Sequence, residues 1–393
     1  MKINYKYLSI VLISMVLCAG CSLLNKKDRA LATIKSSVTI QENVLYPIEV
    51  NGKYGYINRL GKVVVKPQYN SAEDFSEGFG SVCKNTNKNK QTQCGFVNVN
   101  GQEIIPLTFT SALNFSEGLS LVSKDEKYFY INKKGEIAIS NPKYSFIEGF
   151  SEGLAPVEIE NKWGFIDRTG NIVIKPKYDM VGNFHNGLAM AGFIKENDNW
   201  VAHIVGYLNK NGKFIIKPES IGPYQYDFNE GVVAIQHNDM TPCEFKDTHG
   251  KVIFNIQKLG YNNMLDGACV SNFYEGLLAV NIDYKINKWG YINKEGKLVF
   301  QTVIPISPHE TIPEDFYYPL GSFSEGLATY YANGKYGYLD KRWNIKIKTQ
   351  FDEASGFYHD LASVKLKNKY GYIDKTGKFV WYHVNKEREL NEK

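Results

Sequence analysis

The chain repeats one short pattern of apolar and polar positions along most of its length. In "KWGFIDRTGNIVI", residues 162–174, two apolar stretches flank a polar turn. Trp163 and Phe165 share one face of the first stretch, and Ile166 lies on the other face. Because apolar residues occupy both faces, neighbouring units must cover each unit from both sides. No segment keeps a helical period over more than a few turns, so the pattern predicts an all-β fold.

The turn between the two apolar stretches has the same chemistry in nearly every copy. Asn or Asp is followed by two other residues and then Gly, as in Asp167 to Gly170. The Asx side chain caps a type I turn, and Gly adopts the left-handed conformation that closes the hairpin. Trp343 occupies the Gly position of the eighth copy and Asn344 follows it, so we expect that turn to be shifted by one residue. The nine copies begin at residues 56, 96, 130, 165, 207, 245, 291, 338 and 372.

A second motif, Phe-Ser-Glu-Gly in its commonest form, precedes eight of the nine hairpins, and we call it the joint. Successive joints are separated by about 34 residues or more, with insertions up to a spacing of 50. A ring of joint carboxylates would suit calcium or a cationic group. We favour a structural role instead, in which the joint is a tight turn and its Glu accepts local backbone hydrogen bonds, because a repeat needs its joint in every copy. The joint carboxylates are Glu77, Glu117, Glu152, Glu230, Glu275 and Glu325.

These units predict a tandem array of about nine three-stranded β units over residues 44–385, followed by a polar tail at 386–393. Uneven spacing favours an open, curved, solenoid-like array, and a closed β-propeller is the alternative. Seven of the nine units also have a Gly directly before an aromatic residue, such as Gly164, where we expect an aromatic ring from a neighbouring strand to lie over the backbone; Phe129 and Glu244 take its place in the other two units. The aromatic residue before this Gly is expected to be core rather than a platform for sugars: Tyr54, Tyr128, Trp163, Trp289, Tyr336 and Tyr370.

Taken together, these motifs resemble the WG-repeat (KWG) family of bacterial proteins. The resemblance rests on the aromatic-Gly-aromatic triplets, the Asx-x-x-Gly turns, the joints and the Pro-x-Tyr segments at 67–69, 142–144 and 176–178. It covers roughly residues 44 to 382. The family resemblance implies a β-rich interaction module and supplies no catalytic residues.

The N-terminal residues have the pattern of an exported lipoprotein. Lys2 and Lys6 precede an apolar run, residues 8–17, that is too short to span a bilayer. Ala19-Gly20-Cys21 follows and resembles a lipobox, which implies that residues 1–20 are a signal peptide and that Cys21 carries lipid. Residues 21–43 are polar and are expected to form a flexible tether. Ser22 is not the Asp that often retains lipoproteins in inner membranes, so we expect an outer-membrane anchor.

Four further cysteines are expected to form disulfides, because an even number of cysteines in an exported chain is typical of a disulfide framework. Cys83 and Cys94 flank a polar insertion in the second unit, and a bridge there would close the base of that loop. Cys243 and Cys269 would then pair with each other in the sixth unit. Four buried thiols are the alternative.

Enzymatic chemistry has little support in the sequence. The formal net charge is only +5 and basic residues are not clustered, which argues against a nucleic-acid partner. None of the seven histidines has metal-ligand spacing, and there is no phosphate-binding loop or Gly-x-Ser-x-Gly elbow. We therefore expect no catalytic residues, no metal and no cofactor; a hydrolase with a loop-built Asp/Glu pair is the less favoured alternative.

The remaining hypothesis is a binding or scaffolding lipoprotein of the cell envelope that presents its β surface to a protein partner. Glycan or peptidoglycan binding is the alternative within the same class. The largest insertion, residues 302–321, is rich in Pro and lies outside the repeat pattern. Its three adjacent aromatic residues, Phe316, Tyr317 and Tyr318, are predicted to contact the partner, unless they plug one end of the array.

Overall fold

The computed structural model describes residues 44–85, 91–140, 144, 146–197, 200–221, 227–236, 243–261, 264–265, 268–269, 272–304 and 319–384. Its contacts separate Met1–Val44 from Leu45–Lys393, and the fold is that of the second unit. Regular structure in the described residues is β-strand, apart from two single-turn 3-10 helices, η2 (Gln257–Leu259) and η3 (Tyr284–Ile286). The predicted all-β class is confirmed.

The described strands form nine antiparallel sheets of three or four strands, which we call blades 1 to 9 in chain order. Blades 1 to 3 contain β1 (Tyr46–Val50), β2 (Lys53–Ile57), β3 (Val63–Tyr69); β4 (Ser71–Ala72), β5 (Phe79–Asn85), β6 (Thr92–Asn98), β7 (Glu103–Phe109); and β8 (Ser111–Ala112), β9 (Leu119–Lys124), β10 (Lys127–Asn132), β11 (Ile137–Ile139). Blades 4 to 6 contain β12 (Phe146–Ile147), β13 (Leu154–Ile159), β14 (Lys162–Asp167), β15 (Ile172–Tyr178); β16 (Met180–Val181), β17 (Leu188–Asn197), β18 (Trp200–Asn209), β19 (Phe214–Ile221); and β20 (Val232–Ile235), β21 (Glu244–Asp247), β22 (Val252–Asn255). Blades 7 to 9 contain β25 (Leu277–Asp283), β26 (Lys288–Asn293), β27 (Leu298–Val303); β28 (Leu320–Ser324), β29 (Leu327–Ala332), β30 (Lys335–Asp340), β31 (Ile345–Phe351); and β32 (Glu353–Ala354), β33 (Ala362–Leu366), β34 (Lys369–Ile373), β35 (Phe379–Val384). A separate two-stranded sheet, β23 (Met264–Leu265) with β24 (Ala268–Cys269), precedes blade 7.

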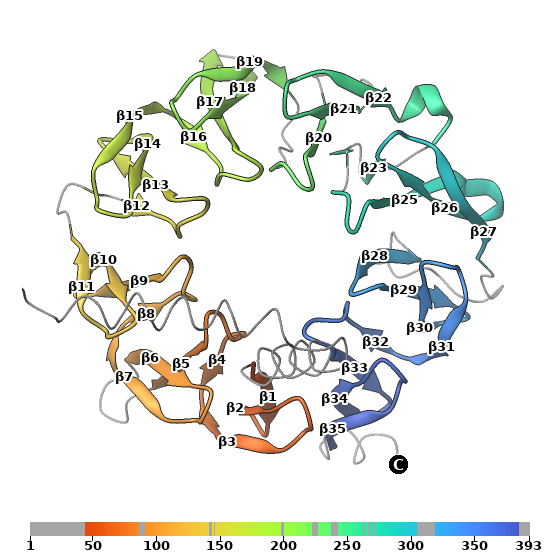
Figure 1. The fold of residues 1–393 in the computed structure, drawn as a ribbon, viewed down its shortest axis with the longest axis horizontal. Coiled ribbons are helices and arrows are strands. Elements are labelled where there is room, and N and C mark those ends of the chain that lie inside the picture. The colour runs from red at the N-terminus through yellow and green to blue at the C-terminus, as the bar shows by residue number, and fades with distance from the viewer. Residues whose placement is uncertain are drawn as a thin grey trace, which may run out of the picture. The chain divides into compact units, whose positions relative to one another are not determined.

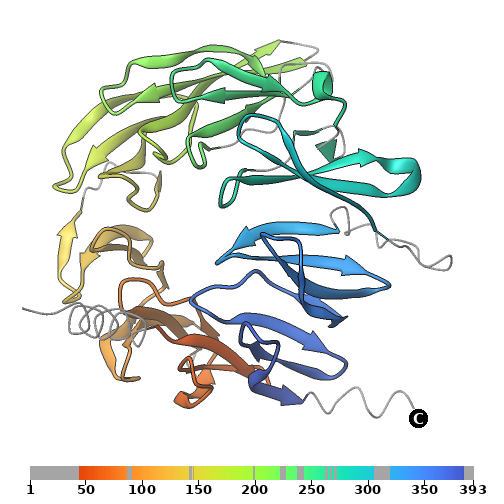
Figure 2. The same cartoon turned by 45° about the vertical axis from the view of Figure 1, so that its right-hand side comes forward.

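The blades follow one another around a ring, with short strands such as β12 and β16 near the centre and β15 and β19 outside (Figure 1). Blade 9 lies beside blade 1 in both views (Figures 1 and 2). The Tyr372 hydroxyl of blade 9 donates a hydrogen bond to the Pro47 carbonyl of blade 1 at 2.8 Å. The unit is therefore a closed β-propeller. The open array that the uneven spacing favoured is wrong, and the propeller alternative is confirmed.

Six of the nine blades have four strands rather than the three predicted, because a further strand lies on the inner side of the hairpin. This strand has two residues in five of these blades and five residues in blade 8, β28. In blade 2 this strand is β4, where Ser71 and Ala72 pair with Cys83 and Val82 of β5. So short a strand has no legible sequence period. Blades 1, 6 and 7 have three strands among the described residues, and in blade 1 β1 is paired only with β2.

The hairpin turns form as the Asx-x-x-Gly pattern predicts. The Asn58 side chain accepts hydrogen bonds from the Leu60 and Lys62 N–H groups at 3.0 Å, and Gly61 has a φ of 77°. The expected shift in the eighth turn is wrong. Trp343 itself takes the left-handed position with a φ of 69°, and the Asn344 N–H reaches the Asp340 carboxylate at 3.0 Å.

Packing explains why Trp343 tolerates that conformation. Its ring stacks on the Phe300 ring at a centroid separation of 4.3 Å and on the Tyr291 ring at 5.5 Å, both in blade 7. Stacked aromatic pairs stabilise a core by about 0.5–1.5 kcal/mol beyond the area they bury. That gain offsets the steric cost of a left-handed non-Gly residue, about 1–2 kcal/mol.

The glycine of each aromatic-Gly-aromatic triplet has a different role from the one predicted. A Cβ on Gly164 would lie 2.4 Å from the Ile174 carbonyl oxygen, and a Cβ on Gly371 would lie 2.1 Å from the Trp381 carbonyl oxygen. The space is therefore filled by the backbone of the outer strand of the same blade, and the expected aromatic ring is not what excludes a side chain.

Aromatic pairs join successive blades. The second aromatic residue of each triplet packs against the joint Phe of the next blade, as Tyr56 does against Phe75 at 4.9 Å. This recurrent contact explains why the joint and the triplet recur together in the sequence. The remaining pairs are Phe96–Phe115, Tyr130–Phe150, Phe165–Phe184, Tyr207–Phe228, Phe245–Phe273, Tyr291–Phe323 and Tyr338–Phe357.

Candidate functional site

The joints are two-residue turns near the centre of the ring. In blade 2 the Ser76 and Phe79 backbones exchange hydrogen bonds of 2.9 and 3.0 Å, and Glu77 and Gly78 have φ values of 53° and 90°. Positive φ at both central residues defines a type I′ turn. The strain of a left-handed Glu recurs in other joints, so the Glu side chain must contribute enough to retain it.

Each joint Glu binds the next blade rather than its own backbone. The Glu77 carboxylate accepts a hydrogen bond from the Gly118 N–H at 2.9 Å, and Glu152 does the same from Gly187 at 2.9 Å. We call this series of contacts the joint ladder. The predicted structural role of the joint Glu holds, but its donors belong to the neighbouring blade and not to the local turn.

Lysine residues complete the joint ladder. The residue after the turn Asx is a lysine in several blades, and its ammonium contacts the joint Glu of the preceding blade. Burial alone would raise the pKa of the Glu77 carboxyl, but the hydrogen bonds from the Lys133 ammonium and the Gly118 N–H lower that pKa below its ordinary value. The ion pairs are Lys133–Glu77 (3.1 Å), Lys210–Glu152 (3.3 Å), Lys294–Glu230 (3.1 Å), Lys341–Glu275 (2.8 Å) and Lys375–Glu325 (2.9 Å).

One step of the joint ladder is neutral on both sides. Asn186 replaces Glu in the joint of blade 5, and its side-chain oxygen accepts the Gly231 N–H at 2.9 Å. The turn of blade 6 has Thr248 at the position where five other blades have the ladder lysine. The matched loss of the carboxylate and the ammonium indicates that the ladder is a contact between blades and not a set of independent cation ligands.

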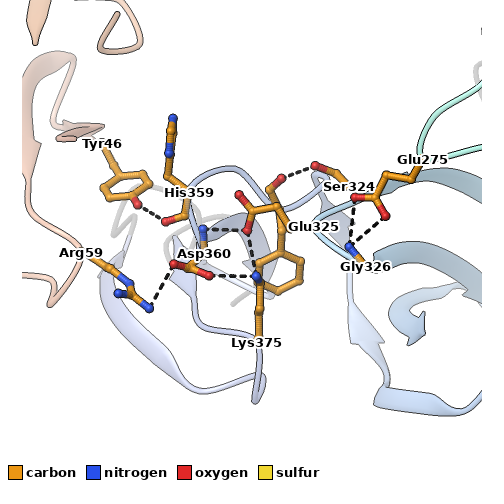
Figure 3. A network of polar contacts seen from close by, with 10 residues as sticks. Tyr46, Arg59, Glu275, Ser324, Glu325, Gly326, His359, Asp360 and Lys375 are labelled. Carbon is orange, nitrogen blue, oxygen red and sulfur yellow. Dashed lines mark hydrogen bonds and ion pairs between the residues drawn. The ribbon is translucent and has the colours of Figure 1, made fainter. Parts of the chain in front are cut away.

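Blade 9 meets blade 1 through a modified step of the same ladder, which we call the seam (Figure 3). Asp360 replaces the joint Gly, and its carboxylate pairs with Arg59 of blade 1 at 3.0 Å and with Lys375 at 2.8 Å. The Tyr46 hydroxyl donates to the His359 carbonyl. The Tyr46 and Tyr372 rings pack at 5.6 Å, so Tyr46 takes the place that a joint Phe takes elsewhere.

At four other interfaces a four-residue segment crosses from the outer strand of one blade to the inner strand of the next. We call it the interblade linker, and it reads aromatic–polar–any–small or apolar. Its aromatic residue is inserted between the blades; Tyr178 is fully buried and Phe351 is 1% exposed. Linkers of this form are Tyr69–Ala72, Phe109–Ala112, Tyr178–Val181 and Phe351–Ala354.

The described residues contain no interblade linker at the seam. The outer strand β35 pairs with β34 without a break from Lys369 to Tyr372, and His383 lies opposite Tyr370 where Phe351 lies opposite Tyr336 in blade 8. A cavity of about 900 Å³ lies here between blades 1 and 9. Its volume falls within the range of small-molecule and peptide pockets, and we take it as the candidate functional site.

Blade 9 supplies one wall of the seam cavity. Alternate residues of β33, β34 and β35 share a face, which gives two cross-strand rows. One row is Ser363, Tyr372 and Trp381, and the other is Lys365, Tyr370 and His383. Trp381 stands where six of the other outer strands place a buried aliphatic residue such as Ile347, and where blades 6 and 7 have Phe254 and Phe300. The wall is therefore aromatic on one side and polar on the other.

Two charged groups of this wall neutralise each other. The Lys365 ammonium pairs with the Glu353 carboxylate at 2.5 Å and lies 5.1 Å from the centre of the Tyr370 ring. The hydrogen bond to Glu353, with a smaller contribution from Tyr370, raises the pKa of Lys365 above its ordinary value. Burial raises the pKa of Tyr372, so its hydroxyl remains a hydrogen-bond donor at neutral pH.

Blade 1 supplies the opposite wall through β1 and the turn that follows it. Pro47, Ile48, Glu49, Asn51 and Gly52 line the cavity. β1 is an edge strand, because the described residues place no strand on its inner side. Edge strands present unpaired backbone groups and are templates for a further strand.

Several residues singled out in the sequence lie elsewhere. Cys83 and Cys94 are directly opposite each other in β5 and β6 and are joined by a disulfide, with a Cα–Cα distance of 4.0 Å. Cys243 is also disulfide-bonded, whereas the Cys269 side chain lies outside the described residues. Cys21 and the aromatic residues Phe316, Tyr317 and Tyr318 lie outside them as well.

The recurring first aromatic residue of the triplet is not uniformly core. Trp289 is 4% exposed, as predicted, but Tyr128 and Tyr370 are 36% and 38% exposed. Tyr370 lines the seam cavity, which the sequence interpretation missed. A signal was present, because "FVWYHV" at the end of the last copy lacks the Pro-x-Tyr segment found in the first, third and fourth copies.

The described part of the chain offers no cluster of three or more His, Cys, Asp or Glu side chains able to hold a metal ion. No helix among the described residues has the length and hydropathy needed to cross a bilayer. The joint carboxylates face backbone N–H groups and lysines, so binding at surfaces and in the seam cavity is the chemistry that this arrangement supports.

The family model described as "WG containing repeat" matches residues 54–88, 95–128, 128–163, 163–200, 206–220, 289–303 and 336–370, together about half of the chain. No curated protein matches the sequence. Among solved structures, a eukaryotic initiation factor aligns over 88% of this chain and 97% of its own at 11% identity, with a TM-score of 0.54. BamB from Moraxella catarrhalis aligns over 75% and 91% at 9% identity, with a TM-score of 0.35. The first likeness shows the propeller fold.

Proposed function

Since the chain belongs to the family of WG-containing repeats, we propose that it is a non-catalytic binding protein of the bacterial cell envelope that holds a protein partner at the seam. Propellers of repeated blades typically serve as binding scaffolds. The seam cavity carries the proposal. It combines an edge strand, β1, with an aromatic and polar wall from blade 9.

The joint ladder supports this assignment by accounting for the charges near the centre of the ring. Glu275, for example, accepts the Gly326 N–H at 3.1 Å and pairs with Lys341. Burial opposes ionisation of this carboxyl, but Lys341 and the Gly326 N–H lower its pKa. A general acid needs a raised pKa near the working pH, so these carboxylates suit a structural role better than hydrolysis.

Partner capture from native membranes tests the proposal. Ser363 is exposed and lines the cavity, so Ser363→Trp would fill the site. Lys348→Trp is the matched control, because Lys348 is an exposed residue of the neighbouring blade 8 outside the cavity lining. We expect chemical crosslinking to recover a partner with the wild-type chain and with Lys348→Trp, and to lose it with Ser363→Trp. Equal recovery by both variants would place the partner elsewhere.

The insertion between blades 7 and 8 is a second contact proposed for the same partner. Phe316, Tyr317 and Tyr318 are adjacent aromatic residues in a Pro-rich segment, a composition suited to an interface. Replacement of residues 305–318 by a short Gly-Ser linker, which keeps the buried Ile304, should weaken capture without changing thermal unfolding. An unchanged partner profile would remove the insertion from the binding surface.

Envelope localisation is proposed from the N-terminal sequence alone. Cys21 follows Ala19 and Gly20 after a short apolar run, and lipid on Cys21 would anchor the chain, with the outer membrane as the expected location. Cys21→Ala should abolish incorporation of radiolabelled palmitate and release the protein from membranes. Persistent labelling of this variant would exclude Cys21 as the acceptor.

A further inference from the structure

We infer that the seam takes up an extended peptide of the partner, which adds an inner strand to β1 and inserts an aromatic residue between blades 9 and 1. This inference rests on the proposed function and specifies its ligand as a segment of the form aromatic–Asp–any–small or apolar. Each element of the ligand is read from the interblade linkers, which fill the equivalent space at other interfaces.

The first element is a two-residue strand. In blade 2 the Cys83 carbonyl accepts the Asn70 N–H at 2.8 Å and the Ser81 carbonyl accepts the Glu73 N–H at 3.0 Å. Ile48 of β1 and Val82 of β5 each pair with the triplet Gly of their own blade. In this alignment Glu49 is equivalent to Cys83, and Pro47 is equivalent to Ser81. Glu49 and Pro47 line the cavity. The Pro47 carbonyl already accepts the Tyr372 hydroxyl at 2.8 Å, as the Ser81 carbonyl accepts the Tyr56 hydroxyl at 3.2 Å beside the Glu73 N–H, so its second lone pair is left for an added strand.

The second element is the aromatic residue. Phe351 lies opposite Tyr336 on the outer strand of blade 8 and is buried between blades 8 and 9. At the seam the position opposite Tyr370 is His383, and the outer strand has no linker aromatic among the described residues. Tyr370, Trp381 and His383 line the cavity at this place, and together they offer a surface on which an inserted aromatic ring can pack.

The third element is the carboxylate. In the linker before blade 9, Asp352 accepts a hydrogen bond from the Lys367 N–H, at a turn position with a φ of 55°. Asn51 holds the same position in blade 1 with a φ of 51° and lines the cavity. The Asp352 carboxylate also pairs with Lys335 of blade 8, and Asp179 pairs with Lys162 of blade 4 in the same way.

Lys369 is the residue of blade 9 equivalent to Lys335 and Lys162, since all three open the strand that carries the triplet. Its ammonium lies 4.7 Å from the centre of the Tyr382 ring. An Asp in the second position of the peptide would therefore meet both the Asn51 N–H and the Lys369 ammonium. This preference distinguishes the site from a general apolar groove.

The last element is a small or apolar residue. The second residue of the inner strand is Ala72, Ala112, Val181 or Ala354 at other interfaces. Ala112, Val181 and Ala354 lie in core clusters shared with the preceding blade. At the seam this side chain would lie beside Ile48, the equivalent of Val82, which pairs with Ala72. A large polar residue there is expected to prevent the strand from pairing.

A synthetic peptide from the chain itself tests the inference. The probe is Lys-Pro-Lys-Tyr-Asp-Met-Val-Gly, the sequence of residues 175–182, labelled with a fluorophore and titrated with the full chain. We expect saturable one-to-one binding by fluorescence anisotropy. The peptide with Ala in place of Tyr should bind at least about tenfold more weakly, because it loses the inserted ring.

Protein variants locate the binding. Ser363→Trp should abolish the anisotropy change, whereas Lys348→Trp should leave it unchanged. Lys369→Ala should weaken the probe about threefold, as expected for a partly exposed ion pair, and should not affect a probe with Asn in place of Asp. The difference between the two probes separates the charge contact from a general loss of fold.

Several results would overturn the inference. These are no saturable binding up to about 1 mM, equal binding of the Ala-substituted probe, or binding unaffected by Ser363→Trp. A photo-crosslinking benzoyl-phenylalanine at position 372 gives a further test. Crosslinks that reach only residues 1–43 of the same chain would also overturn the inference. Loss of partner capture in Ser363→Trp without any probe binding would refute the strand mode and leave the proposed function standing.

Discussion

Replacing Trp343 by Gly is expected to destabilise the propeller, although Gly is the usual residue at that position. Trp343 has a φ of 69°, and relief of that strain would gain about 1–2 kcal/mol. The substitution also removes the indole ring that stacks on Phe300 at 4.3 Å and Tyr291 at 5.5 Å. Loss of a packed Trp costs about 3–5 kcal/mol, and the lower end applies here because Trp343 is only partly buried.

The net expectation is a loss of about 1.5 kcal/mol in the free energy of unfolding. Urea unfolding followed by far-ultraviolet circular dichroism measures it without relying on the fluorescence of the removed Trp. Trp343→Phe is the control, because it keeps an aromatic ring on Phe300 and should lose less. A Trp343→Gly variant as stable as the wild type, or more stable, would refute the claim that interblade stacking retains the strained residue.

Three further predictions concern the joint ladder and the disulfide. Asn186→Glu should lower the free energy of unfolding, because blade 6 has Thr248 and no lysine to pair with the new carboxylate. Adding Thr248→Lys should restore the stability, and a double-mutant cycle measured by urea unfolding would show it. The pKa values of Glu77, Glu230 and Glu275 lie below the ordinary 4.5, so the stability that these carboxylates contribute is fully present above pH 4.5 and is lost as the pH falls through their folded pKa values. A variant with Gln at all three positions should therefore show a smaller fall in the urea midpoint on acidification than the wild type. The double variant Cys83→Ser, Cys94→Ser lacks the disulfide that joins residues 11 apart in sequence, and its free energy of unfolding should be about 3 kcal/mol lower. A reducing agent should lower the stability of the wild type by the same amount and should leave the double variant unchanged.

The local structure of each repeat was predictable because its information lies in adjacent residues. Asn58 and Gly61 form the turn that their types require, and the joint forms the tight turn expected of Ser-Glu-Gly. Ring closure was not predictable from this pattern. It depends on the angle between blades, which contacts such as Glu77 to Gly118 set across 41 residues of sequence.

The seam was missed because it is defined by what the last copy lacks. Repeat detection weighs shared residues, and the triplet and turn of the last copy are regular from Tyr370 to Gly377. The informative departure lies after the turn, where Trp381 and His383 replace an aliphatic residue and a linker aromatic. The triplet glycine was misread for a related reason, since its neighbour is the backbone of its own blade and backbone positions leave no mark on side-chain patterns.

Hydrogen exchange with and without the peptide of residues 175–182 tests the central claim most directly. Peptide-level mass spectrometry resolves β1 (Tyr46–Val50) and the β33 to β35 segment of blade 9 from the equivalent strands of other blades. The account predicts that peptide binding slows exchange in β1 and blade 9 and leaves blades 2 to 7 unchanged. Protection that appears in other blades, or no change in β1, would contradict a seam that binds an added strand.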